Sequence, residues 1–164
     1  ICFIDNKDED YVSYIMEKGY MPQEGAFIDN QGNLLGKHKG LLNYTIGQRK
    51  GLGITFGKPV FVTKIDSFNN AVTLGSNDEL FAKKVTTKNN FFIINSNKEF
   101  PMEYDKMNVT AKIRYSAKPA AAFINFGDED TVTAIFEEPQ RAFTPGQSIV
   151  FYKDDIVIGG GFIQ

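Results

Sequence analysis

The chain of 164 residues has no tryptophan, a single cysteine, Cys2, and a single histidine, His38. One cysteine excludes a disulfide within the chain and any metal site built from several thiolates. One histidine without a neighbouring cysteine gives no basis for a zinc site. We therefore expect no metal ion.

Long apolar runs are also missing. No stretch approaches the roughly 20 apolar residues of a membrane-spanning helix, and no secretory signal pattern is present. We therefore expect a cytoplasmic location and no membrane partner. The sequence begins with Ile1 and not with methionine, which favours a piece cut from a longer protein.

Acidic residues are absent from two long windows, although the net charge of the whole chain is −2. Residues 31–65 hold six Lys or Arg and residues 106–127 hold four, in both cases without an acid. Such windows can form a locally positive face for a polyanion. Chance clustering on a solvated surface explains them equally well.

Hydrophobic sequence is abundant: 42% of the residues are hydrophobic and 15 are Phe, which predicts a packed core. Residues 6–19 have the apolar spacing of a short helix that Gly19 ends. Residues 26–28 and 34–35 predict a hairpin around DNQGN. From Pro59 onward, many short apolar runs alternate with turn signals, which is typical of a barrel or a sandwich. We place a domain boundary at residues 57–60.

Two glycine-rich stretches interrupt this pattern. YTIGQRKGLG, residues 44–53, is too rich in glycine for a helix and carries Arg49 and Lys50 at its centre. Its glycines could wrap a phosphate, but their spacing matches neither the P-loop nor the dinucleotide-binding fingerprint. GGG at 159–161 lies within a strand pattern and indicates a bulge, a barrel corner or a close backbone approach.

Local patterns also position several polar residues. TPGQ, residues 144–147, predicts a type II turn with Gly146 at positive φ, so that Gln147 lies at the mouth of a hairpin. A plain tight turn is the simpler interpretation. Strand alternation in NVTAKIRY places Lys112 and Arg114 on one face. The other face receives Val109, Ala111, Ile113 and Tyr115.

Few side chains indicate catalysis by themselves. Cys2 lies near a predicted helix start, which can favour the reactive thiolate, but ICFI is apolar and fits an inert buried cysteine better. His38 could act as an acid or a base, although an exposed loop histidine is the more frequent case. Tyr44, Tyr115 and Tyr152 could stack on bases, but tyrosines are more often structural.

Several motifs occur together in a familiar order: ICFI, GKHKGLLNYTIGQRKGLGI, KIRY, EEPQRAFTPGQSIVFY and IGGGFI. With them the chain closely resembles the C-terminal half of bacterial tRNA-specific 2-thiouridylases, along essentially its whole length. The resemblance implies a mainly β fold. Residues 1–58 would hold the end of a catalytic region and a small central α/β domain, and residues 59–164 a C-terminal antiparallel β-barrel.

The resemblance implies an ATP-dependent enzyme that replaces the C2 oxygen of the wobble uridine of certain tRNAs by sulfur. Cys2 matches the family's second catalytic cysteine, which carries a persulfide. The terminal sulfur attacks C2 of the adenylated uridine and AMP departs. A partner cysteine, absent from this sequence, then helps to release the sulfur by forming a disulfide.

The same resemblance implies residues that contact tRNA. Arg114 and Tyr115 in KIRY, and Gln147 in TPGQ, match positions that touch tRNA in the family. The family often continues RY with Arg-Gln, whereas Ser116 and Ala117 follow here. Further candidate contacts, to RNA or to another domain, are His38, Gln48, Arg49 and Lys50.

ATP would bind to an N-terminal domain whose SGGxDS-type loop is not in this sequence, so we expect the chain to hold no cofactor and to be inactive alone. The implied partners are tRNA and a sulfur-relay donor protein or a cysteine desulfurase. Two alternatives remain. One is an RNA-binding β-barrel module in which Cys2 is incidental. The other is a methyltransferase, which is disfavoured because no glycine-rich cofactor loop follows a strand.

Overall fold

The structure, a computed structural model, describes residues 11–93, 106–127 and 130–164. The chain divides into two compact units, Ile1–Glu79 and Leu80–Gln164. Each unit has a hydrophobic core of its own. Cys2 and the expected beginning of the first helix, residues 6–10, lie outside the described residues.

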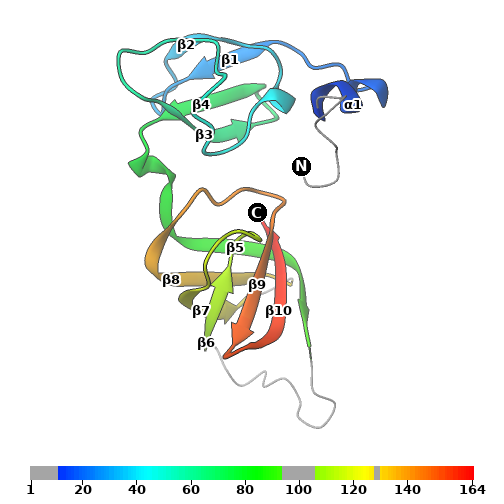
Figure 1. Cartoon of the computed structure of the whole chain (residues 1–164), viewed down its shortest axis with the longest axis vertical. Helices are drawn as coiled ribbons and strands as arrows, with labels where there is room; N and C mark the ends of the chain where they lie inside the picture. The colour runs from blue at the N-terminus through cyan, green and yellow to red at the C-terminus, as the bar shows by residue number, and fades with distance from the viewer. Residues whose placement is uncertain (1–10, 94–105, 128–129) are drawn as a thin grey trace. The chain divides into compact units, whose positions relative to one another are not determined.

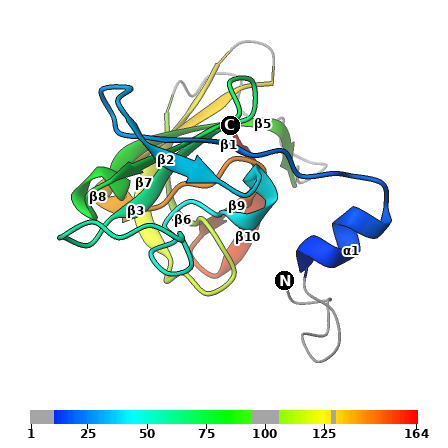
Figure 2. The same cartoon turned by 90° about the horizontal axis from the view of Figure 1, so that it is seen from above.

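The first unit is a four-stranded sheet with a short helix to one side (Figures 1 and 2). Its strands lie in the order β2-β1-β4-β3. β1 pairs antiparallel with β2, which confirms the predicted hairpin, and parallel with β4. The elements are α1 (Tyr11–Glu17), β1 (Gly25–Ile28), β2 (Leu34–His38), η1 (Leu41–Asn43), β3 (Phe61–Asp66) and β4 (Ala71–Gly75), with η2 (Asp78–Leu80) at the boundary of the units.

Helix α1 ends in the way that the sequence predicts. Gly19 has a φ of 91°. Its N–H donates to the Met16 carbonyl with an N–O distance of 2.9 Å, and the Tyr20 N–H donates to the Ile15 carbonyl at 3.4 Å. These two bonds form a Schellman cap, whose left-handed position favours glycine.

The core of the first unit explains where the chain divides. Phe27 on β1 lies opposite Val72 on β4, and both pack with Val62 and Leu74. Strands β3 and β4 were expected to begin the barrel, with a boundary at residues 57–60. They pair with each other and with β1 instead, because their apolar side chains cover Phe27. The first unit therefore extends to Glu79.

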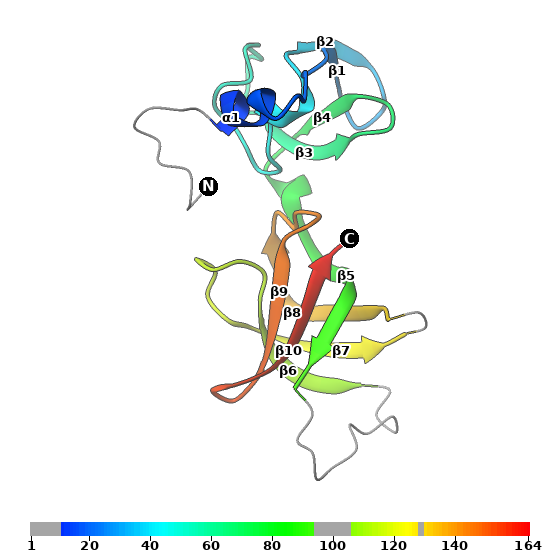
Figure 3. The same cartoon turned by 90° about the vertical axis from the view of Figure 1, so that its right-hand side faces the viewer.

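The second unit is a closed barrel of six strands in the order β10-β5-β8-β7-β6-β9 (Figure 3). Every pairing in it is antiparallel. The barrel confirms the predicted fold class, mainly β with a C-terminal antiparallel β-barrel. Its strands are β5 (Phe81–Phe92), β6 (Met107–Lys112), β7 (Ala120–Phe126), β8 (Val132–Arg141), β9 (Ser148–Lys153) and β10 (Ile156–Ile163).

The three glycines of β10 lie where neighbouring atoms leave no room for a side chain. A Cβ on Gly159 would overlap the Phe92 ring, and one on Gly160 would overlap the Ile149 carbonyl oxygen. The register of β10 also shifts against both neighbours, between Val157 and Gly159 and between Gly160 and Phe162. The close backbone approach and the bulges indicated by the sequence are therefore confirmed.

Glu79 joins the end of the first unit to the turn between β1 and β2. Its Oε1 accepts a hydrogen bond from the Ser76 backbone N–H at 2.7 Å, and its Oε2 accepts one from the Asn30 amide at 3.1 Å. These bonds, that from the Ser76 backbone first, hold the pKa of the Glu79 carboxyl below its ordinary value of 4.5. Glu79 therefore stabilises this unit in its ionised form.

We expect Glu79→Gln to lower the melting temperature at neutral pH but not in strong acid. Because the folded-state pKa is depressed, the stabilisation is present above the ordinary value of 4.5 and is lost as the pH falls through the folded-state pKa. Circular dichroism melts over a pH series measure the difference. Asp78→Asn is the control, since it removes a charge from the same turn. An effect of Glu79→Gln that stays constant into strong acid would contradict this explanation.

Candidate nucleic-acid interface

Arg114 and Tyr115 lie in a tight turn directly after β6. The strand ends at Lys112, and the Ala117 N–H donates to the Arg114 carbonyl at 3.1 Å. Tyr115 therefore occupies the first central position of a β-turn. Its side chain is 97% exposed.

The end of β6 corrects one prediction about this segment. Val109, Ala111 and Ile113 are buried, as strand alternation predicts. Tyr115 does not share their face, because the alternation of side chains holds only while the chain is extended. The predicted placement of Tyr115 with the buried residues is wrong, and the turn presents its ring to solvent instead.

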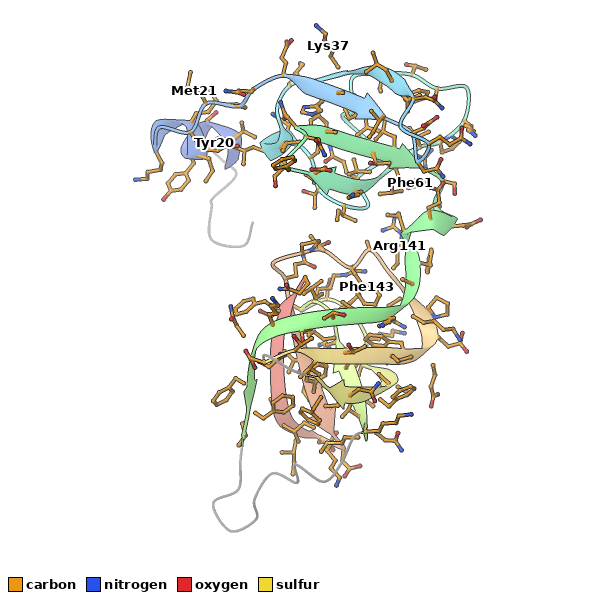
Figure 4. The ribbon with its side chains drawn as sticks, turned by 180° about the vertical axis from the view of Figure 1, so that it is seen from behind. Tyr20, Met21, Lys37, Phe61, Arg141 and Phe143 are labelled. Atoms are coloured by element: carbon orange, nitrogen blue, oxygen red, sulfur yellow. The ribbon has the colours of Figure 1, made fainter. Side chains whose placement is uncertain are left out.

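The guanidinium of Arg114 is held by the neighbouring backbone. Its Nη1 donates to the carbonyl of Arg141, at the end of β8 and labelled in Figure 4, over 3.2 Å. A guanidinium has five N–H donors, so this bond fixes the side chain while using one of them. Nearby, Nζ of Lys112 lies 5.8 Å from the centroid of the Tyr115 ring, a cation–π contact.

These side chains line a pocket of about 260 Å³ on the barrel. Two cations and two tyrosines contribute to it, and the remaining lining residues are small or aliphatic. The pocket is formed within the second unit, from the end of β6, the turn after it and strand β9. Its lining residues are Lys112, Arg114, Tyr115, Ser148, Val150 and Tyr152.

Gln147 lies at the end of the predicted turn. Gly146 has a φ of 82°, and the Gln147 N–H donates to the Thr144 carbonyl at 3.1 Å, which confirms the turn. The Gln147 carbonyl accepts the N–H of Ile163 at 2.8 Å, and its side chain is half-buried. Gln147 does not line the pocket, but Ser148, which follows it in the chain, does.

The stretch YTIGQRKGLG is a loop fixed at both ends, as expected from its composition. Tyr44 and Leu52 are buried in the core of the first unit. Between and beyond them, Gly47, Gly51 and Gly53 have φ values of 88°, 73° and 74°, where other residues are strained. The glycines therefore allow the chain to turn tightly between two core side chains.

Gln48 holds this loop together, whereas its two cations face solvent. Oε1 of Gln48 accepts the Thr45 N–H at 3.0 Å, and Nε2 donates to the Lys50 carbonyl at 2.9 Å. Gln48 thus positions the loop, and Arg49 and Lys50 are exposed on it.

His38 is part of the core. It is 1% exposed, and its ring packs edge-on against Phe27 and Tyr44 with centroids 5.6 Å away in both cases. The Gly40 N–H donates to Nδ1 at 3.0 Å, which leaves Nε2 to donate to the Asn70 carbonyl at 3.1 Å. The expectation of an exposed loop histidine is wrong, and burial removes His38 from direct contact with RNA.

Lys112 was not singled out as a site residue from the sequence. The alternation expected from the sequence puts Lys112 on the same face as Arg114, and this was a usable signal. The pairing of β6 with β9, which brings Tyr152 to the same pocket, is non-local and has no local signal in the sequence.

Over residues 11–93, 106–127 and 130–164, no three His, Cys, Asp or Glu side chains gather as metal ligands. The same ranges contain no helix with the length and apolarity to cross a bilayer.

Two family models match the chain, one in each unit. That described as "tRNA methyl transferase PRC-barrel domain" matches residues 13–76. That described as "Aminomethyltransferase beta-barrel domain" matches residues 83–163. The two matches therefore assign the units to the classes of barrel domain that these descriptions name.

Curated relatives indicate the family to which the chain belongs. The tRNA-specific 2-thiouridylase MnmA of Clostridioides difficile (strain 630) is 52% identical over 165 residues, which cover 100% of this chain and 44% of the relative. The proteins of the same name from Acetivibrio thermocellus and Clostridium perfringens (strain 13 / Type A) are 50% and 48% identical, with the same coverage. The chain spans less than half the length of these relatives. It belongs to the tRNA-specific 2-thiouridylase family, which confirms the resemblance found in its motifs.

We expect His38→Phe to destabilise the first unit without affecting RNA affinity. Phenylalanine keeps the ring but leaves the Gly40 N–H and the Asn70 carbonyl unpaired, at a cost of about 1–3 kcal/mol per buried group. Urea denaturation measures the loss. The exposed neighbour Lys37, which points away from the sheet in Figure 4, provides the control variant Lys37→Ala. Unchanged stability of His38→Phe would contradict the structural role.

Proposed function

We propose that this chain is the C-terminal part of a tRNA 2-thiouridylase, which transfers a persulfide sulfur to C2 of the wobble uridine of tRNA. The chain supplies the second catalytic cysteine, Cys2, and contacts tRNA through Arg114, Tyr115 and Gln147. One observation carries the proposal: the chain is 48–52% identical, over its whole length, to enzymes named for this reaction.

In this proposal Cys2 carries the sulfur as a persulfide. The terminal sulfur forms a bond to C2 of a uridine whose oxygen has been activated for departure, and that oxygen leaves with AMP. The thiolate of a partner cysteine, outside this chain, then attacks Sγ of Cys2. The bond between Sγ and the transferred sulfur breaks, its electron pair stays on the tRNA sulfur, and a disulfide between the two cysteines remains.

The tRNA contacts have suitable chemistry. The planar guanidinium of Arg114 suits a phosphate or a base edge, and the exposed ring of Tyr115 suits stacking on an unpaired base. Gln147 offers an amide for a base edge. The bond from Arg114 to the Arg141 carbonyl supports this assignment, because a cation that is already held in place loses less entropy when RNA binds.

Arg49 and Lys50 are proposed as further contacts, to the RNA backbone or to the adenylating domain. Both are exposed on a loop that is fixed by Tyr44 and Leu52 in the core. Two exposed cations on a fixed loop suit phosphate neutralisation. Gln48 contributes by shaping the loop, and His38 takes no direct part.

The glycine-rich loop does not fit an ATP site. The backbone N–H groups of Gly47 and Gln48 donate to the carbonyls of Val62 and Thr45, so they cannot cradle phosphates. We propose that ATP binds and activates the uridine outside this chain, and that the chain alone is inactive. tRNA and a sulfur-relay donor protein or a cysteine desulfurase are the proposed partners of the whole enzyme.

A second candidate function is RNA binding without sulfur transfer. The pocket lined by Arg114 and Tyr115 is formed within the second unit. RNA could therefore dock on the barrel whether or not Cys2 reacts. The two candidates differ only in the role of Cys2.

In the full-length enzyme, Cys2→Ala should abolish 2-thiouridine formation, because no persulfide can form, and should leave tRNA affinity nearly unchanged. Mass spectrometry of digested tRNA measures the product, and filter binding measures the affinity. Normal thiolation by this variant would remove the catalytic role of Cys2 and favour the binding module.

Arg114→Ala should weaken tRNA binding and reduce the magnitude of the slope of log K against log salt concentration by about 1. The reason is that the variant makes one phosphate contact fewer and so releases fewer counterions on binding. Arg114→Lys should keep the slope. The matched control is Lys84→Ala, since Lys84 is exposed on β5, which pairs with neither β6 nor β9. Identical isotherms for the wild type and Arg114→Ala across salt concentrations would rule out the contact.

A further inference from the structure

The pocket beside Arg114 is lined by a second aromatic ring, that of Tyr152. The family resemblance gives this residue no role. Tyr152 lies on β9 and is half-buried, whereas Tyr115 lies in the turn after β6. Two tyrosines from different elements therefore line one pocket. Aromatic rings that solvent can reach offer surfaces on which a nucleobase can stack.

Strand register fixes Tyr152 on the outer face of the barrel. In the pairing of β6 with β9, Thr110 lies opposite Tyr152 and Lys112 opposite Val150. The intervening pair, Ala111 and Phe151, is buried in the core. Side chains alternate along a strand, so Lys112, Val150 and Tyr152 all point outward.

Lys112 links the two rings. Its Nζ lies over the ring of Tyr115, 5.8 Å from the centroid. Across the strand pair it is also the diagonal neighbour of Tyr152, a relation in which long side chains can touch. One cation therefore lies beside both aromatic residues of the pocket.

The size and charge of the pocket select the ligand class. Its volume, about 260 Å³, leaves room for one small group. Its described lining residues include two cations, Lys112 and Arg114, and no carboxylate. Val150 adds an apolar surface and Ser148 a hydroxyl. A nucleobase attached to an anionic backbone matches this combination.

We propose that Tyr152 and Lys112 complete a pocket for one unpaired nucleobase of the RNA, with the base stacked on Tyr152 and Lys112 beside the adjoining phosphate. This inference rests on the proposed function, because it assumes that RNA docks on the barrel. It adds two residues to the contacts at Arg114 and Tyr115. It also makes the barrel selective for unpaired over paired RNA, since bases in a duplex cannot stack on a side chain.

The test uses fluorescence anisotropy with two labelled RNA probes, a hairpin with an anticodon-type loop and a fully paired duplex. Tyr152→Ala should weaken hairpin binding by roughly 5- to 150-fold, the range for loss of one stacked base, and leave duplex binding unchanged. Tyr152→Phe should recover most of the loss, because the ring and not the hydroxyl provides the stacking. The control is Phe68→Ala, which removes a 94% exposed ring from the first unit and should leave both affinities unchanged.

A hairpin carrying 5-bromouridine in its loop provides a measurement that needs no variant. Irradiation with the wild-type chain should crosslink Tyr152, which trypsin releases in the peptide of residues 142–153. Circular dichroism melts confirm that the variants fold.

The outcomes separate the inference from the function on which it rests. Wild-type hairpin affinity in Tyr152→Ala, together with weakened binding in Arg114→Ala, overturns the nucleobase pocket and leaves the proposed function standing. The pocket is also overturned if Phe68→Ala loses as much hairpin affinity as Tyr152→Ala, or if the crosslinked residues do not include Tyr152. Equal weakness of the wild-type chain toward hairpin and duplex counts against RNA docking on the barrel, and so against both.

Discussion

Strand β9 is the element on which both the barrel and the candidate interface depend. It pairs with β6 along one edge and with β10 along the other, and so closes the sheet on itself. Its inward side chains, Ile149 and Phe151, fill the core, while Ser148, Val150 and Tyr152 face the pocket. A slip of one residue would exchange the two sets. The packing that stabilises the barrel therefore also determines which side chains line the proposed RNA pocket.

The local parts of the fold were predictable because their causes are local. Gly19 ends α1 with hydrogen bonds that involve only its near neighbours in the chain, and the turn before Gln147 follows from Pro145 and Gly146. The membership of β3 and β4 was not predictable in the same way. Both segments have the apolar pattern of strands. Their place in the first sheet depends on the pairing of Phe27 with Val72, which joins distant parts of the sequence.

The candidate site was predictable to the extent that its residues lie in recognisable motifs. KIRY pointed to Arg114 and Tyr115, and the structure brings both into one pocket. His38 was misplaced because two lysines flank it and suggested an exposed loop. The polar–His–polar order of Lys37, His38 and Lys39 also fits a strand, in which the residue between two exposed lysines faces the core. Strand alternation indicated that Lys112 shares a face with Arg114. The pairing of β6 with β9, which brings Tyr152 to the pocket, has no local signal in the sequence.

The anchoring of residues 44–53 at Tyr44 and Leu52 gives this loop a property that surface connections usually lack. Both anchors are buried in one core, and the chain between them is tied to Val62 of β3. The Gly47 N–H donates to the Val62 carbonyl, and the Val62 N–H donates to the Gln48 carbonyl. Insertion or deletion of a residue would pull an anchor from the core or break that tie. The segment should therefore tolerate changes of side chain at Arg49 and Lys50 far better than changes of length.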